Sequence, residues 1–108
     1  MVIVVFRSRL RPAADQAEVV QLGERMYGLA SAMPGFVAYK DFEAADGESL
    51  TLVEFESTGT LLAWRNHPEH LAVQARGREA FFSEYQISVC EPQRAYRFSL
   101  EQGRVDLM

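Results

Sequence analysis

The feature that most constrains the fold is an apolar run at the start of the chain, Val2-Ile3-Val4-Val5-Phe6. Such β-branched and aromatic side chains favour a strand, whose successive side chains point to opposite faces of a sheet. Because both faces of this run are apolar, we expect a central strand that is covered on both sides. Beyond the run, Arg7 and Arg9 share one parity, and we place the strand at residues 2–10.

An amphipathic helix is predicted next, over about residues 13–33. Apolar residues recur there at steps of three and four and form one stripe: Val19, Leu22, Met26, Leu29 and Met33. Pro12 occupies the place of a first helical residue, where its missing N–H costs nothing. Pro34 and Gly35 end the helix.

The rest of the chain divides at its turn and capping residues. Residues 36–44 and 50–56 are predicted strands joined by an Asp-Gly turn, so they form an antiparallel hairpin. Ser57 is the expected N-cap of a short helix to about residue 66, and a proline then restarts a helix over residues 68–83. A last strand is predicted over residues 85–98, with Pro92 at an edge or bulge.

This order of elements, β-α-β-β-α-β, predicts an α+β, ferredoxin-like fold. Two helices would cover one face of a four-stranded antiparallel sheet. Because the strands are apolar on both parities, the other face also needs a cover, and a second copy of the chain is the expected one. We therefore predict a homodimer, with residues 1–100 as one domain and residues 101–108 as a C-terminal tail.

Composition excludes several classes of function. A chain of 108 residues has room for one domain, and its net charge of −4 argues against nucleic-acid or anionic-membrane partners. Cys90 is the only cysteine, so neither an internal disulfide nor a thiolate metal cluster is expected, and we interpret it as a small interior hydrophobic residue. The apolar start is too short for a membrane span or a signal core, which predicts a cytoplasmic location.

The candidate chemistry lies between Trp64 and His70, a segment that holds the only tryptophan and both histidines. His70 falls in the first turn behind Pro68, where the positive helix end keeps an imidazole neutral, and we predict it to be a general base. His67 either binds substrate or caps the helix. Trp64 either packs in the core or stacks on a flat ring. A third metal ligand is not evident, so no metal site is predicted.

Three further residues are candidate substrate contacts. Tyr39 and Tyr85 lie on different predicted strands and either face the helix-covered side or form a cross-strand aromatic pair. Arg7 either holds an anionic substrate or pairs with Glu54 or Glu56 on a neighbouring strand, and we favour the ion pair.

The order of elements and three segments resemble the antibiotic biosynthesis monooxygenase (ABM) family over about residues 2–98. The segments are Met33-Pro34-Gly35-Phe36, residues 52–57 (Leu-Val-Glu-Phe-Glu-Ser) and residues 64–70. The resemblance implies a dimeric α/β barrel. The family includes cofactor-independent monooxygenases of aromatic polyketides, haem-degrading enzymes and autoinducer-processing proteins.

The resemblance separates two branches of this family. Haem-degrading members carry a tryptophan on the short helix, a histidine ligand about ten positions later and an asparagine near the end of the first strand. Trp64 matches, but position 74 is Gln74 and the first strand has no asparagine, which argues against haem degradation. Polyketide-oxidising members bind substrate around the same tryptophan, and His70 lies near the position of their phenolic side chain.

The predicted function is therefore a cofactor-independent monooxygenase that acts on a planar aromatic or quinol-type small molecule. Such a reaction needs a base, an apolar cavity and a donor for the developing oxyanion, and it needs no flavin or metal motif. The sequence has no glycine-rich dinucleotide fingerprint. A non-catalytic, dimeric small-molecule-binding module is the alternative, because it requires the same cavity without a base.

Overall fold

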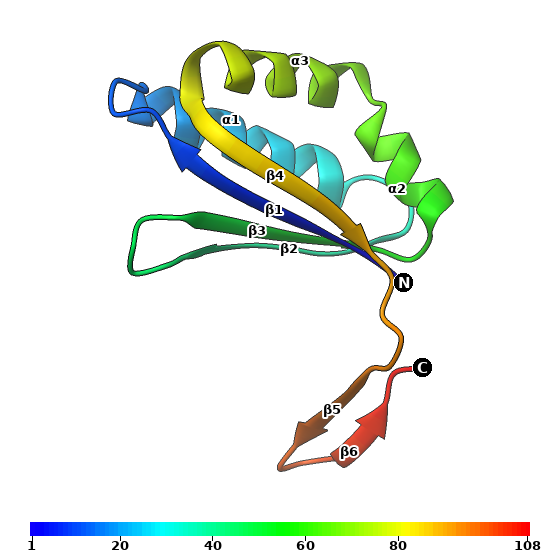
Figure 1. Ribbon diagram of the computed structural model, residues 1–108. Coiled ribbons are helices and arrows are strands. Elements are labelled where there is room, and N and C mark those ends of the chain that lie inside the picture. The colour runs from blue at the N-terminus through cyan, green and yellow to red at the C-terminus, as the bar shows by residue number, and fades with distance from the viewer.

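The computed structural model describes all 108 residues, and its body combines one sheet with helices on one side (Figure 1). The strands of the sheet are β1 (Val2–Leu10), β2 (Phe36–Glu43), β3 (Ser49–Phe55) and β4 (Phe82–Cys90). They pair antiparallel in the order β2-β3-β1-β4, so β1 is an interior strand, as predicted. The helices are α1 (Gln16–Ser31), α2 (Thr58–Arg65) and α3 (Pro68–Arg76). The α+β, ferredoxin-like prediction is confirmed.

The core lies between the sheet and the helices. Alternation along β1 turns Val4 toward the helices, where it lies opposite Val53 of β3 and Val89 of β4. The buried cluster consists of Val2, Val4, Ala30, Val53, Phe55, Leu61 and Trp64. Only 12 of 108 residues are buried in a single chain, so the helices cover only part of the sheet.

The first helix begins later than the sequence predicted. Pro12 is not its first residue: the backbone N–H of Ala14 donates to the carbonyl of Arg11 at 3.0 Å, which closes a turn before the helix. Asp15 is the N-cap, and its carboxylate accepts from the backbone N–H of Glu18 at 3.2 Å. A carboxylate at this position satisfies a free helical N–H, so the cap and not the proline sets the boundary.

The second helix begins as predicted, behind Ser57. The Ser57 hydroxyl accepts from the backbone N–H of Thr60 at 3.2 Å, and the Thr60 hydroxyl accepts from the backbone N–H of Ser57 at 3.2 Å. This capping box fixes the start of α2 and therefore the position of Trp64 further along it.

Gly35 connects α1 to β2 directly against that cap. Its φ is +78°, and a Cβ at this position would lie 2.6 Å from the Cβ, Cγ2 and Oγ1 atoms of Thr60. Gly47, in the turn between β2 and β3, has φ +90° but nothing within 4 Å of a Cβ. A side chain at Gly47 would therefore meet backbone strain alone, whereas a side chain at Gly35 would meet backbone strain and a collision with Thr60.

We expect Gly35→Ala to lower the free energy of unfolding by about 2 kcal/mol or more, because it adds a collision to the left-handed strain. Gly47→Ala, the matched control, should cost only about 1–2 kcal/mol of strain. Urea unfolding of both variants at one protein concentration measures the difference. Equal losses would show that Thr60 yields without cost.

The helix predicted over residues 68–83 ends early. α3 stops at Arg76, and a π-turn, η1 (Gly77–Phe81), leads directly into β4. The Arg11 guanidinium, at the end of β1, donates to three carbonyl oxygens of residues 78–82 at 2.6 to 3.0 Å. These three bonds satisfy carbonyls that the helix no longer pairs, so a distant side chain determines where the helix ends.

The prediction of one last strand over residues 85–98 is wrong in its second half. β4 ends at Cys90, and a separate hairpin follows, formed by β5 (Tyr96–Ser99) and β6 (Gly103–Asp106). Pro92 follows the end of β4, where it has no N–H to continue the ladder.

The face of the sheet opposite the helices is uncovered in a single chain. Alternation places half-buried Ile3, Val5, Leu50 and Leu52 at its centre. Ion pairs lie toward one end, where Arg7 contacts Glu48 at 3.1 Å and Arg9 contacts Asp46 at 2.8 Å. Cys90 lies opposite Ile3 on this face and is exposed in the single chain, so the prediction that it is an interior residue depends on a second copy covering the face.

Candidate active site

A cleft of about 920 Å³ lies between the helices and the sheet, and 19 of its 30 lining residues are hydrophobic. It exists because the helices do not close over β4. Tyr85, Ile87 and Val89 of β4 face the helix side, yet they are 37%, 42% and 50% exposed. Both the volume and the apolar lining are typical of a small-molecule site.

An aromatic stack forms one wall of the cleft. The Trp64 ring lies between Phe55 of β3, with centroids 5.6 Å apart, and His70 of α3, with centroids 4.2 Å apart and planes inclined by 16°. Trp64 is 5% exposed, and its buried Nε1 has no hydrogen-bond partner. An unpaired buried N–H is costly, and Nε1 is the one buried side-chain polar atom that has no partner.

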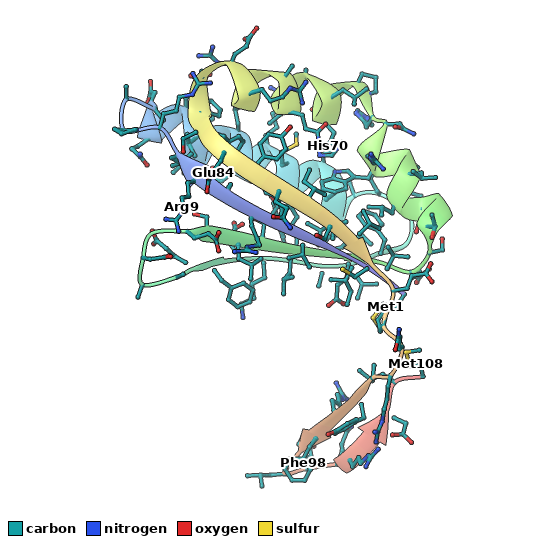
Figure 2. All side chains as sticks on the ribbon, viewed as in Figure 1. Met1, Arg9, His70, Glu84, Phe98 and Met108 are labelled. Atoms are coloured by element: carbon teal, nitrogen blue, oxygen red, sulfur yellow. The ribbon has the colours of Figure 1, made fainter.

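His70 is placed by the first turn of α3. Figure 2 shows it between α3 and the sheet, and it lines the cleft beside Trp64. Its Nδ1 lies 3.1 Å from the carbonyl oxygen of Arg65. A carbonyl only accepts, so Nδ1 carries the proton in the neutral ring and Nε2 keeps the lone pair. Burial lowers the pKa of His70, and the backbone carbonyls of Arg65 and Trp64 offset only part of that effect.

The two tyrosines lie on opposite edge strands and flank the cleft. Tyr39 is on β2, and burial raises its pKa to about 12, so its phenol is a hydrogen-bond donor at neutral pH. Tyr85 is on β4, and its ring packs 5.6 Å from Phe6 and 5.7 Å from Phe82. The two tyrosines are therefore not a cross-strand pair.

Arg7 and His67 do not line the cleft. Arg7 has the parity of the uncovered face and pairs with Glu48, so ion pairing was the correct expectation but Glu54 and Glu56 were the wrong partners. His67 is the N-cap of α3, and its Nδ1 accepts from the backbone N–H of Glu69 at 3.1 Å. Neither position supports a contact with a molecule bound in the cleft.

Sequence reasoning missed polar residues of the cleft. Ser8 is 6% exposed and lines the cleft next to apolar neighbours. Asp41 and Thr51 also line it, and the Thr51 hydroxyl donates to the Asp41 carboxylate at 2.6 Å. The alternation of β1 identifies Ser8, since it shares the parity of Val4 and Phe6. The position of Asp41 depends on the register between β2 and β3.

The first 76 residues match the antibiotic biosynthesis monooxygenase family. The chain belongs to this family. The sequence is also 32% identical over 78 residues to the uncharacterized protein YqjZ of Bacillus subtilis. The aligned region covers 72% of this chain and 68% of the relative.

Solved structures share the fold of this ABM chain. Rv0793 from Mycobacterium tuberculosis superposes with a TM-score of 0.77 at 26% identity and covers 87% of this chain and 96% of its own. SnoaB from Streptomyces nogalater, described as a cofactor-independent oxygenase, superposes in its N63A form with a TM-score of 0.74 at 14% identity, over 87% and 94% of the two chains. At that identity the likeness to SnoaB establishes the fold alone.

Two features are absent from this ABM chain. None of its helices combines the length and apolar character that crossing a membrane requires. No group of three or more His, Cys, Asp or Glu side chains is arranged to hold a metal ion.

Proposed function

We propose that this ABM protein is a cofactor-independent monooxygenase that oxidises a flat, electron-rich aromatic molecule held in the helix–sheet cleft. The observation that carries the proposal is the pairing of Trp64 with a neutral His70 on the wall of an apolar cleft. Membership of the family and the fold shared with SnoaB support the same reaction class.

The proposed reaction begins with proton transfer. Nε2 of His70 accepts a proton from an acidic C–H or O–H of the substrate, and the resulting anion is electron-rich enough to reduce O₂. Oxygen adds to the ring carbon to give a peroxide anion, which takes the proton back from Nε2 of His70 and becomes a hydroperoxide. Loss of water from the hydroperoxide leaves a carbonyl. For an anthrone-type CH₂ group, one O₂ is consumed, and one quinone carbonyl and one water are formed.

The other groups of the cleft hold the ring and its oxygen. Phe55 and His70 cover the two faces of the Trp64 ring, so the substrate lies against the edge of the ring, and the unpaired Nε1–H is the proposed donor for the oxyanion that forms when the proton leaves. The protonated phenol of Tyr39 also lines the cleft and is the second proposed donor, and Tyr85 offers an aromatic edge. The apolar lining excludes water from the anion.

Oxygen uptake by the chelator-treated protein tests this function. We expect substrate-dependent O₂ consumption with at least one member of a panel of anthrones, hydroxynaphthalenes and quinols, with quinone formed in a 1:1 ratio. Absence of uptake above buffer across the panel would contradict the proposal. Tight retention of a panel member without turnover would instead favour the non-catalytic binding module.

The pH dependence follows from the lowered pKa of His70. A protonated imidazole cannot accept a proton, so kcat/KM should fall as the pH decreases through the pKa of His70. Burial lowers this pKa from 6.5, so the rate should be on its plateau at pH 7 and the inflection should lie below pH 6.5. A rate profile from pH 4.5 to 8, with a substrate that does not itself ionise there, measures it. An inflection above pH 6.5 would exclude His70 as the base.

We also propose that two copies pair through their uncovered sheet faces. The apolar centre of that face, Ile3, Val5, Leu50 and Leu52, is only half-buried in a single chain. Burying such an apolar strip favours association, and in a twofold dimer the strip of one chain packs against the same strip of the other. Sedimentation velocity at micromolar concentration should give twice the chain mass of 12.2 kDa.

A further inference from the structure

The C-terminal hairpin stands away from the body. We call residues 94–108 the C-terminal arm; its hydrogen bonds and ion pair all lie within the arm. The radius of gyration is 15.4 Å, against about 13 Å for a compact chain of this length. The arm therefore gains no hydrogen bonds from the body that precedes it.

The arm exposes large apolar side chains. Tyr96 and Phe98 share one face of the hairpin and are 53% and 68% exposed, and Leu100 in its turn is 98% exposed. Figure 2 shows Phe98 at the far end of the arm. A two-stranded hairpin alone is marginally stable in water, and exposed aromatic groups gathered at one end are typical of a binding surface. The arm consequently has the features of a binding surface.

The direction of the arm indicates which surface. In Figure 1 the helices lie above the sheet and the arm hangs below it, on the side of the uncovered face. A second copy seated on that face would lie beside the arm. Charge agrees: residues 1–90 carry 8 Lys and Arg against 12 Asp and Glu, whereas the arm carries three Arg against Glu101 and Asp106. The arm, with a net charge of +1, is thus attracted to a body with a net charge of −4.

We propose that the C-terminal arm is a dimerisation arm, which packs the Phe98 and Leu100 end against the body of a second copy of this chain. The inference rests on the sheet-face dimer proposed above and adds a contact that this dimer does not need in order to form. Arg94 and Arg104 hold the ring of Tyr96 at 5.4 and 4.2 Å, which keeps the hairpin face rigid before it binds.

Sedimentation equilibrium of full-length variants tests the arm. The double variant Phe98→Ser, Leu100→Ser should raise the dimer dissociation constant about 100-fold or more, because two large apolar anchors are lost from each arm. Leu62→Ser is the matched control: Leu62 is 41% exposed on α2, outside the cleft, and should leave the constant unchanged. Leu52→Glu, at the centre of the uncovered face, should abolish the dimer, and circular dichroism checks that each variant is folded.

The outcomes separate the arm from the dimer. If Leu52→Glu dissociates the protein but the arm variant does not, the dimer stands and the arm proposal is overturned. A wild-type protein that is monomeric at every concentration overturns both. Hydrogen exchange of the wild type is a second measurement: the amides of residues 96–106 should lose protection on dilution below the dissociation constant. Protection that is independent of concentration, or absent in the dimer, also overturns the arm proposal.

Discussion

Replacing His70 by glutamine is expected to lower kcat for an aromatic substrate by about 10²–10⁴-fold, the usual contribution of a positioned base. The amide of glutamine is able to keep a hydrogen bond to the carbonyl of Arg65 but cannot accept a substrate proton. Binding should change less than turnover, because Trp64 and the apolar lining remain. Steady-state O₂ uptake measures kcat and KM separately.

The other histidine provides the control for this experiment. His67 caps α3 and lies outside the cleft, and asparagine is a good N-cap, so His67→Asn should retain both stability and rate. If His70→Gln and His67→Asn both keep the wild-type rate, no histidine is the base and the proton must leave by another route. If both variants lose activity equally, the start of α3 matters for structure and not for proton transfer.

Replacing Phe55 by alanine should produce the largest loss of stability, about 3–5 kcal/mol in the free energy of unfolding. Phe55 has 0% exposure and is the largest fully buried side chain. Its ring joins Trp64, 5.6 Å away, to Phe36, 6.0 Å away, so its loss leaves a cavity between the sheet and α2. Guanidinium unfolding, followed by circular dichroism, measures the change.

The matched control for Phe55 is an apolar residue that is exposed on the same side of the molecule. Leu62→Ala on α2 should change stability by no more than about 0.5 kcal/mol. All chains must be compared at one concentration, because the proposed dimerisation would add to apparent stability. A loss below about 1.5 kcal/mol for Phe55→Ala would mean that the core collapses around the missing ring, and that Trp64 is held by α2 alone.

Much of the fold was predictable because it is encoded locally. The two-sided apolar run of residues 2–6 identified an interior strand, and Ser57 identified the start of α2. One error at a helix boundary was local and another arose from a distant contact. The Asp15 cap overrides Pro12, and the Arg11 guanidinium ends the helical region at the π-turn. Arg11 and the carbonyl groups of residues 78–82 lie too far apart in the sequence for the pattern of a single helix to reveal their contact.

The site was predictable to the extent that residue parity and helix position determine it. Trp64, His70, Tyr39 and Tyr85 all line the cleft. Their chemical roles stay predictions. For Arg7 the favoured alternative, an ion pair, was correct, and its parity already set it on the opposite face from the helix-facing residues of β1. The shape of the cleft was not predictable, because it depends on how far the helices extend over β4.

The central claim is that a flat aromatic molecule binds in the cleft against Trp64, the only tryptophan. Titration of the protein's intrinsic fluorescence with a hydroxylated anthraquinone, a stable product analogue, tests it directly. We predict saturable quenching with one ligand per chain. Quenching that does not saturate and only equals that of N-acetyltryptophanamide in the same solution would contradict the claim.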